Sequence, residues 1–67
     1  MEDFNLPCGL SDDITTVWCD DGYVFSKVTE IRNGDPWSET DGCRHDKDKV
    51  IALRDWLNAA IAEMEKE

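Results

Sequence analysis

The chain has 67 residues and a net charge of −9, with sixteen acidic against seven basic side chains. A chain of this length forms one small domain with little room for a deep, water-excluded cleft, so we expect no catalytic site. The negative charge disfavours direct binding to nucleic acid or to anionic membranes, and a basic protein surface is its natural complement. The same charge also serves solubility alone.

The first eleven residues contain Pro7 and Gly9, and we predict an irregular segment there, with the single domain spanning 1–67. Glu2 and Asp3 directly follow Met1, so no basic, apolar secretory leader is evident. We therefore expect a cytoplasmic protein with reduced thiols.

The strongest local pattern predicts a β-hairpin over residues 14–31. Two runs rich in β-branched and aromatic residues, 14–19 and 23–31, flank the turn sequence Asp20-Asp21-Gly22. A two-residue turn would place Trp18 opposite Phe25, and a three-residue loop would place Trp18 opposite Val24.

The sequence favours the three-residue loop, because it gathers apolar side chains cleanly on one face, namely Ile14, Trp18, Val24 and Val28. The other face then carries Val17, Tyr23, Phe25 and Lys27. Such a face is apolar enough to bind a protein unless the N-terminal segment covers it.

Asn33-Gly34 predicts another turn, followed by a short third strand near residues 37–40 and a polar loop at 40–46. The last third predicts a helix over 47–66, begun by Asp46 or Asp48. Its apolar residues recur at helical spacing: Val50, Leu53, Leu57, Ile61 and Met64, widened by Trp56 and Ala60.

We expect a small two-layer α+β domain in which this helix packs on an antiparallel hairpin or three-stranded sheet, with Trp18 and Trp56 as core anchors. Three cysteines and one histidine give the count that a structural zinc site needs, but no Cys-x-x-Cys knuckle is present. The four residues are Cys8, Cys19, Cys43 and His45. We therefore expect no cofactor and no metal, and keep a zinc-stapled domain as a third hypothesis.

In size, acidity and expected lack of catalysis, the chain resembles in type the small accessory proteins of phages and mobile elements. That resemblance implies an anti-CRISPR-like or anti-restriction-like inhibitor that covers a basic, nucleic-acid-binding surface of a host defence complex. Its predicted contacts are carboxylates and aromatic anchors: Asp12, Asp13, Asp20, Asp21, Glu30, Asp35, Tyr23, Phe25 and Trp37. The alternative is a general interaction or regulatory module, or a homodimer, that uses a hydrophobic face.

Overall fold

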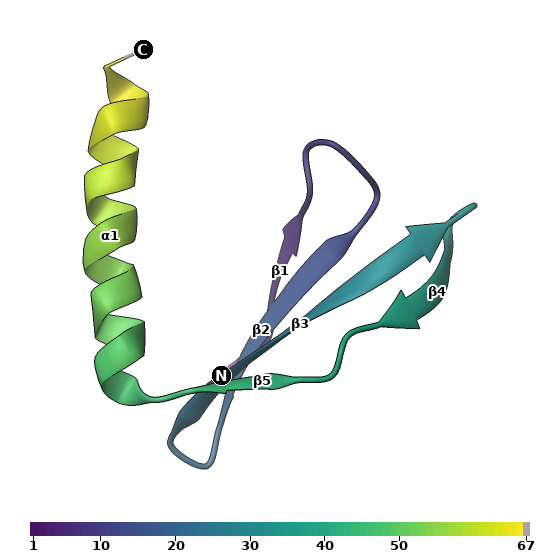
Figure 1. Cartoon of the computed structure of the whole chain (residues 1–67), viewed down its shortest axis with the longest axis horizontal. Helices are drawn as coiled ribbons and strands as arrows, with labels where there is room; N and C mark the ends of the chain where they lie inside the picture. The colour runs from purple at the N-terminus through teal and green to yellow at the C-terminus, as the bar shows by residue number, and fades with distance from the viewer. Residues whose placement is uncertain (67) are drawn as a thin grey trace.

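A computed structural model describes residues 1–66 and confirms the α+β class, with an antiparallel sheet followed by one C-terminal helix (Figure 1). The elements are β1 (Phe4–Pro7), β2 (Ile14–Asp20), β3 (Tyr23–Arg32), β4 (Asp35–Glu39), β5 (Cys43–His45) and α1 (Lys47–Glu65). Strands run in the order β1-β2-β3-β4, and β5 also pairs with β3. The ten-residue β3 is thus the central strand, with β2 along one side and both β5 and β4 along the other.

Two tight turns connect β2 to β3 and β3 to β4. Both central residues of each turn have positive φ: 49° at Asp21 and 80° at Gly22, then 55° at Asn33 and 82° at Gly34. This pattern belongs to the two-residue type I′ turn, whose twist matches that of the adjoining strands. The turns predicted at both positions are therefore present.

The hairpin register differs from the one favoured by the sequence. Trp18 lies opposite Phe25, and Cys19 lies opposite Val24, so the two-residue turn is correct and the three-residue loop is wrong. The three-residue loop was favoured because it gave the cleaner apolar face, but both faces carry apolar side chains in either register. The geometry of the turn, and not the apolar pattern, therefore sets the pairing.

The N-terminal segment is not wholly irregular, as it was predicted to be, because residues 4–7 form β1 against β2. Phe4 lies opposite Val17 and Pro7 lies opposite Ile14. The loop back to β2 is closed by a hydrogen bond from the Cys8 amide to the Asp13 carbonyl, 2.9 Å long. This strand went unpredicted because it is short and is held by pairing with a distant segment.

The second half of the sheet is also more regular than expected. The third predicted strand is present as β4, but starts earlier, at Asp35, and includes Pro36 beside an irregularity in β3. The region predicted as a loop at 40–46 contains β5, in which Cys43 lies opposite Ser26. Prolines are tolerated at such edge positions because an edge strand needs fewer amide donors.

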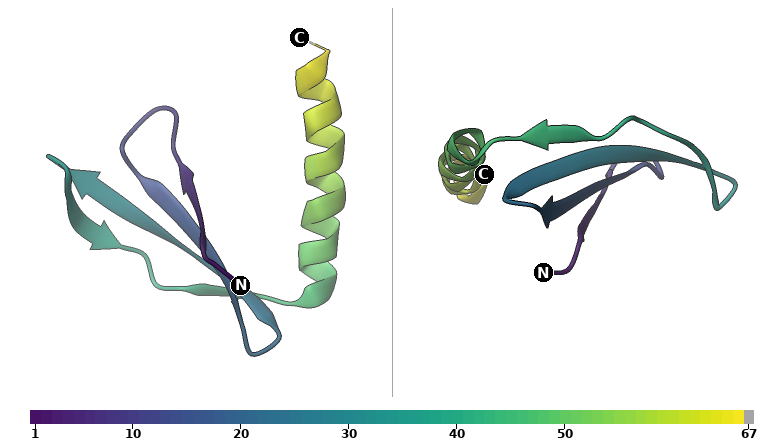
Figure 2. Two further views of the ribbon diagram at one scale, coloured as in Figure 1. Left: turned by 180° about the vertical axis from the view of Figure 1, so that it is seen from behind. Right: turned by 90° about the horizontal axis from the view of Figure 1, so that it is seen from below.

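The helix begins where predicted and is described to Glu65. One residue, Asp46, separates it from β5, and the Asp46 carbonyl accepts hydrogen bonds from the amides of Lys49 and Val50. Figure 2 shows α1 rising from one end of the sheet and diverging from it rather than lying along its face. Among residues 1–66, no helix combines the length and apolar character that crossing a bilayer requires.

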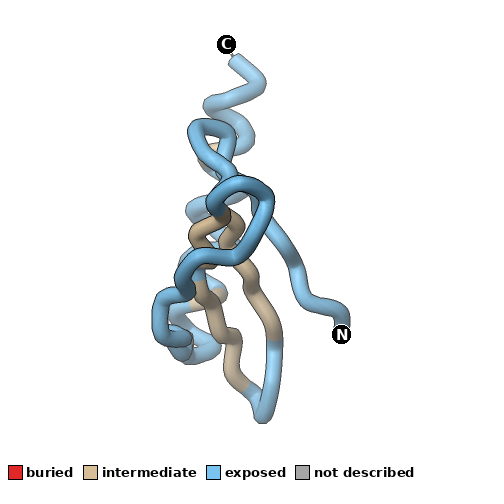
Figure 3. Tube along the Cα trace, turned by 90° about the vertical axis from the view of Figure 1, so that its right-hand side faces the viewer, coloured by how far each residue is buried: buried red, intermediate tan, exposed pale blue. Residues whose placement is uncertain are grey.

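No residue in the described chain is buried (Figure 3). The best-covered positions are half-buried and lie mainly along β2 and β3. The predicted core anchors are therefore wrong: Trp56 is 65% exposed, and Trp18 stacks on Phe25 on the sheet face turned away from the helix. The sheet and helix together leave an apolar space between them.

Candidate protein-interaction surfaces

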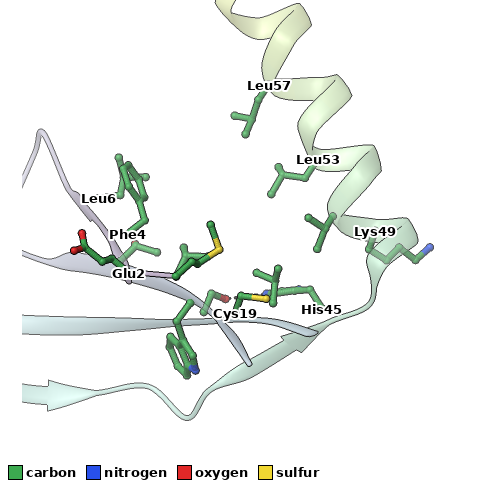
Figure 4. A pocket seen from close by; sticks show the side chains of 15 residues that line it. Glu2, Phe4, Leu6, Cys19, His45, Lys49, Leu53 and Leu57 are labelled. Carbon is green, nitrogen blue, oxygen red and sulfur yellow. Dashed lines mark hydrogen bonds between the residues drawn. The ribbon is translucent and has the colours of Figure 1, made fainter. Parts of the chain in front are cut away.

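An open apolar groove of about 690 Å³ separates the sheet from α1 (Figure 4). One wall is the sheet face that carries every second residue of β1, β2 and β3, including Phe4, Leu6 and Val17. The other wall is the first half of the helix, chiefly Val50, Leu53 and Leu57. We call this space the groove.

A hydrogen-bonded serine and histidine lie in the floor of the groove. The Ser26 hydroxyl and His45 Nε2 are 2.9 Å apart and partly buried. Pairing of β5 with β3 brings these two residues together from positions 19 apart in the chain. This contact was not predicted from the sequence, because residues 43–45 were expected to lie in a loop and not in β5.

The Ser26–His45 pair alone does not make a hydrolytic site. Activation of a serine also needs a group that orients the histidine and donors that stabilise an oxyanion. Within residues 1–66, His45 makes no hydrogen bond to a carboxylate. Its evident role is to join β5 to β3 across the groove floor.

The opposite sheet face carries an aromatic cluster held by cations. The rings of Trp18 and Phe25 stack with centroids 5.6 Å apart. Arg44 lies over Tyr23 at 4.4 Å, and Lys27 lies over Trp18 at 5.8 Å. Tyr23 and Phe25 are therefore half-buried by neighbours in the same chain, which lessens their value as free anchors.

No family model, curated protein or solved structure matches this chain. Its function is therefore inferred from its own surfaces.

The predicted acidic contacts divide between the two ends of the sheet. Asp20 and Asp21 lie at the β2–β3 turn, beside Tyr23. The others lie at the far end, where β2 starts and β3 meets β4: Asp12, Asp13, Glu30 and Asp35, together with Trp37. We call these five residues the acidic end. The structure thus separates the nine predicted contact residues into two groups instead of one continuous patch.

Trp37 is the exposed aromatic of the acidic end. Its side chain is 64% exposed, and the Arg32 guanidinium lies 4.7 Å above the ring. Arg32 also donates a 2.8 Å hydrogen bond to Glu30, which accepts a second hydrogen bond from Ser38. These two donors, Arg32 first, lower the pKa of Glu30 and keep it ionised.

Few carboxylates are neutralised within the chain. In residues 1–66, four acidic side chains form ion pairs: Glu30, Glu39, Asp55 and Glu63. Asp12 and Asp35 are exposed, Asp13 is half-buried, and none of the three takes part in these pairs. Their negative charge is available to a partner.

The cysteines and the histidine do not assemble into a metal site. Cys19 on β2 shares one face of the sheet with Cys43 and His45 on β5, but β3 lies between these strands, and Cys8 lies in the loop after β1. Within residues 1–66, no group of three or more such side chains is close enough to hold a metal ion. The hypothesised four-residue zinc set is therefore not brought together.

The Cys8 thiol lies close to backbone and hydroxyl groups of its own loop. The Leu10 amide points at its sulfur from 3.4 Å. This contact, followed by those with Ser11, lowers the pKa of Cys8 and favours the thiolate. Cys8 is exposed and lies outside the groove, so the effect is local.

Proposed function

We propose that this protein is a non-catalytic inhibitor that uses its acidic end to cover a basic, nucleic-acid-binding surface of a partner protein. The observation that supports this best is the exposed indole of Trp37 at the same end of the sheet as Asp12, Asp13 and Asp35, which make no internal ion pair. Interface hot spots combine a large aromatic anchor with a polar rim in this way. The setting expected from the sequence is the cytoplasm of a cell whose defence complexes handle DNA or RNA.

The carboxylates supply attraction and the tryptophan supplies contact area. Asp12, Asp13 and Asp35 would meet Arg or Lys side chains that otherwise hold phosphates. Trp37 is already covered on one face by the Arg32 guanidinium, which shows that the ring accepts a cation. A partner arginine can make the same contact.

The net charge of −9 adds long-range steering. Opposite potentials accelerate encounter, and this effect weakens as salt screens the charges over about 10 Å at 0.1 M. Binding to the basic partner should therefore weaken steeply with ionic strength. A nucleic acid that uses the same basic surface should compete directly.

The test is capture of nucleic-acid-binding proteins from nuclease-treated host lysate on the immobilised chain. We expect a partner that is eluted by a salt gradient and displaced by an oligonucleotide, and whose own DNA or RNA binding the protein blocks. Asp12→Asn, Asp13→Asn and Trp37→Ala together should abolish capture. The matched control is Asp20→Asn with Asp21→Asn, which removes two charges from the opposite end of the sheet and should preserve capture through the acidic end. Capture that resists 1 M salt, or survives loss of the acidic end, would contradict the proposal.

The groove favours a second function, an interaction module with a hydrophobic contact. Its walls are almost wholly apolar, and exposed apolar surfaces of this extent are typical of binding sites. The two functions use different surfaces and can coexist in one molecule.

A further inference from the structure

The chain exposes more surface than a folded monomer of its mass. Its accessible surface is 5841 Å², whereas a monomer of 7.7 kDa exposes about 4,300 Å² by the usual scaling with mass. Its radius of gyration is 14.0 Å, against about 11 Å for a compact domain of this length. The surplus, about 1,500 Å², has the size of one partner's share of a large interface.

We propose that two copies of this chain form a homodimer in which each copy's α1 fills the groove of the other. The groove walls are the sheet face with Phe4, Leu6 and Val17 and the helix face with Val50, Leu53 and Leu57. Around a two-fold axis the two helices pair, and each lies between its own sheet and its partner's. This inference goes beyond the proposed function, because the groove and the acidic end are different surfaces.

The area of such a dimer fits a permanent assembly. Two copies that each lose the surplus bury about 3,000 Å² in total, within the range of obligate homodimers, about 2,000–5,000 Å². A weak encounter would bury under about 1,200 Å² and would leave much of the apolar surface in water. The dimer thus supplies the core that neither copy contains alone.

The apolar stripe of the helix extends beyond the groove. Ile61 and Met64 are 50% and 70% exposed and do not line it, and Trp56 lies with Ala60 beside a second shallow hollow. A small apolar ligand in the groove would leave these side chains uncovered. A second helix of 19 residues, about 28 Å long, covers the whole stripe.

The connection to β5 opposes closure of the groove by the chain's own helix. Asp46 alone joins β5 to α1, and its carbonyl is fixed by the first helical hydrogen bonds. β5 in turn is paired to β3 and held by the Ser26–His45 hydrogen bond. The direction of the helix is therefore set by a short, anchored segment, which leaves the space open for another copy.

Charge does not prevent this association, although each copy carries −9. Glu2 and Lys49, of opposite sign, are the charged residues that line the groove within the described chain. The repulsion therefore comes from charges outside the contact and is screened by salt. Dimerisation should strengthen as ionic strength rises, opposite to binding of a basic partner.

Sedimentation equilibrium from nanomolar to high micromolar concentration, at low and high salt, tests the dimer. We expect twice the chain mass of 7.7 kDa at micromolar concentration, with tighter association in salt. Leu57→Asp places a charge on the groove wall and should raise the dissociation constant of the dimer about 100-fold or more. Leu10→Asp makes the same change at a side chain that is 99% exposed outside the groove, and should leave it unchanged.

Thiol alkylation of the unaltered protein gives a second measurement that does not depend on a variant's folding. Cys19 lines the groove, and Cys8 lies outside it as an internal reference. Cys19 should become protected relative to Cys8 as concentration rises through the dissociation constant. A monomer at all concentrations, equal protection throughout, or a monomer mass carrying a bound small molecule would overturn the dimer. Salt-sensitive capture by such a monomer would leave the proposed function standing.

Discussion

Substitution of Gly22 by alanine tests the turn that sets the hairpin register. Gly22 has φ of +80°, in the left-handed region that L residues avoid, and an added Cβ would meet no atom within 4 Å. The cost of Gly22→Ala is therefore backbone strain alone, with no steric clash. Gly9→Ala is a matched control, because its Cβ also meets nothing within 4 Å and its φ is outside that region.

The magnitude follows from the difference between these two variants. Both lose the same backbone freedom in the unfolded chain, which by itself stabilises the fold by about 0.4–1 kcal/mol. Only Gly22→Ala carries the left-handed penalty, about 1–2 kcal/mol. The unfolding free energy of Gly22→Ala should thus lie about 1–2 kcal/mol below that of Gly9→Ala.

Thermal unfolding followed by circular dichroism, at equal protein concentration, measures this difference. For a chain of this size it corresponds to a midpoint roughly 4–16 °C lower for Gly22→Ala. Gly34→Ala should behave like Gly22→Ala, since Gly34 has φ of +82° and similarly open surroundings. If Gly22→Ala melts together with Gly9→Ala, the type I′ turn, and with it the assignment of residues to the groove, is wrong.

Two further predictions concern titration. Arg32→Ala should raise the pKa of Glu30, measured by NMR of its carboxyl carbon, because it removes the strongest of the donors that lower it, and Lys27→Ala should leave that pKa unchanged. Folding lowers the pKa of Glu30, so the ionised carboxylate stabilises the fold above its unfolded pKa, and this contribution is lost as pH falls through the folded pKa. The unaltered protein should therefore lose more stability in acid than Arg32→Ala does. The pH midpoint for alkylation of Cys8 should lie lower in the folded chain than in urea, and Ser11→Ala, which removes one hydroxyl contact, should shift it upward. A pH midpoint that is the same in urea would show that the Leu10 and Ser11 contacts do not form.

The features predicted correctly from the sequence depend on neighbouring residues. Asp21-Gly22 and Asn33-Gly34 favour positive φ without help from the rest of the fold, so both turns were found. The helix was found because its apolar spacing and its start after Asp46 are also local. These elements suffice for the α+β class.

The features that were missed depend on contacts between distant segments. β1 is four residues long and ends in proline, and its strand conformation comes from pairing with β2. β5 likewise exists through its pairing with β3. The groove requires both strands and the correct hairpin register, so its lining could not be predicted from local patterns. The separation of Asp20 and Asp21 from Trp37 was missed for the same reason.

The prolines at the two margins of the sheet limit how copies of this chain can associate. Pro7 ends β1 at one margin and Pro36 lies in β4 at the other, and neither offers an amide to an incoming strand. Strand-by-strand growth into a fibril is thereby discouraged, although the molecule leaves much apolar surface uncovered. Copies can still associate through the faces of the sheet and helix, and such contacts can form a closed oligomer with a finite number of subunits.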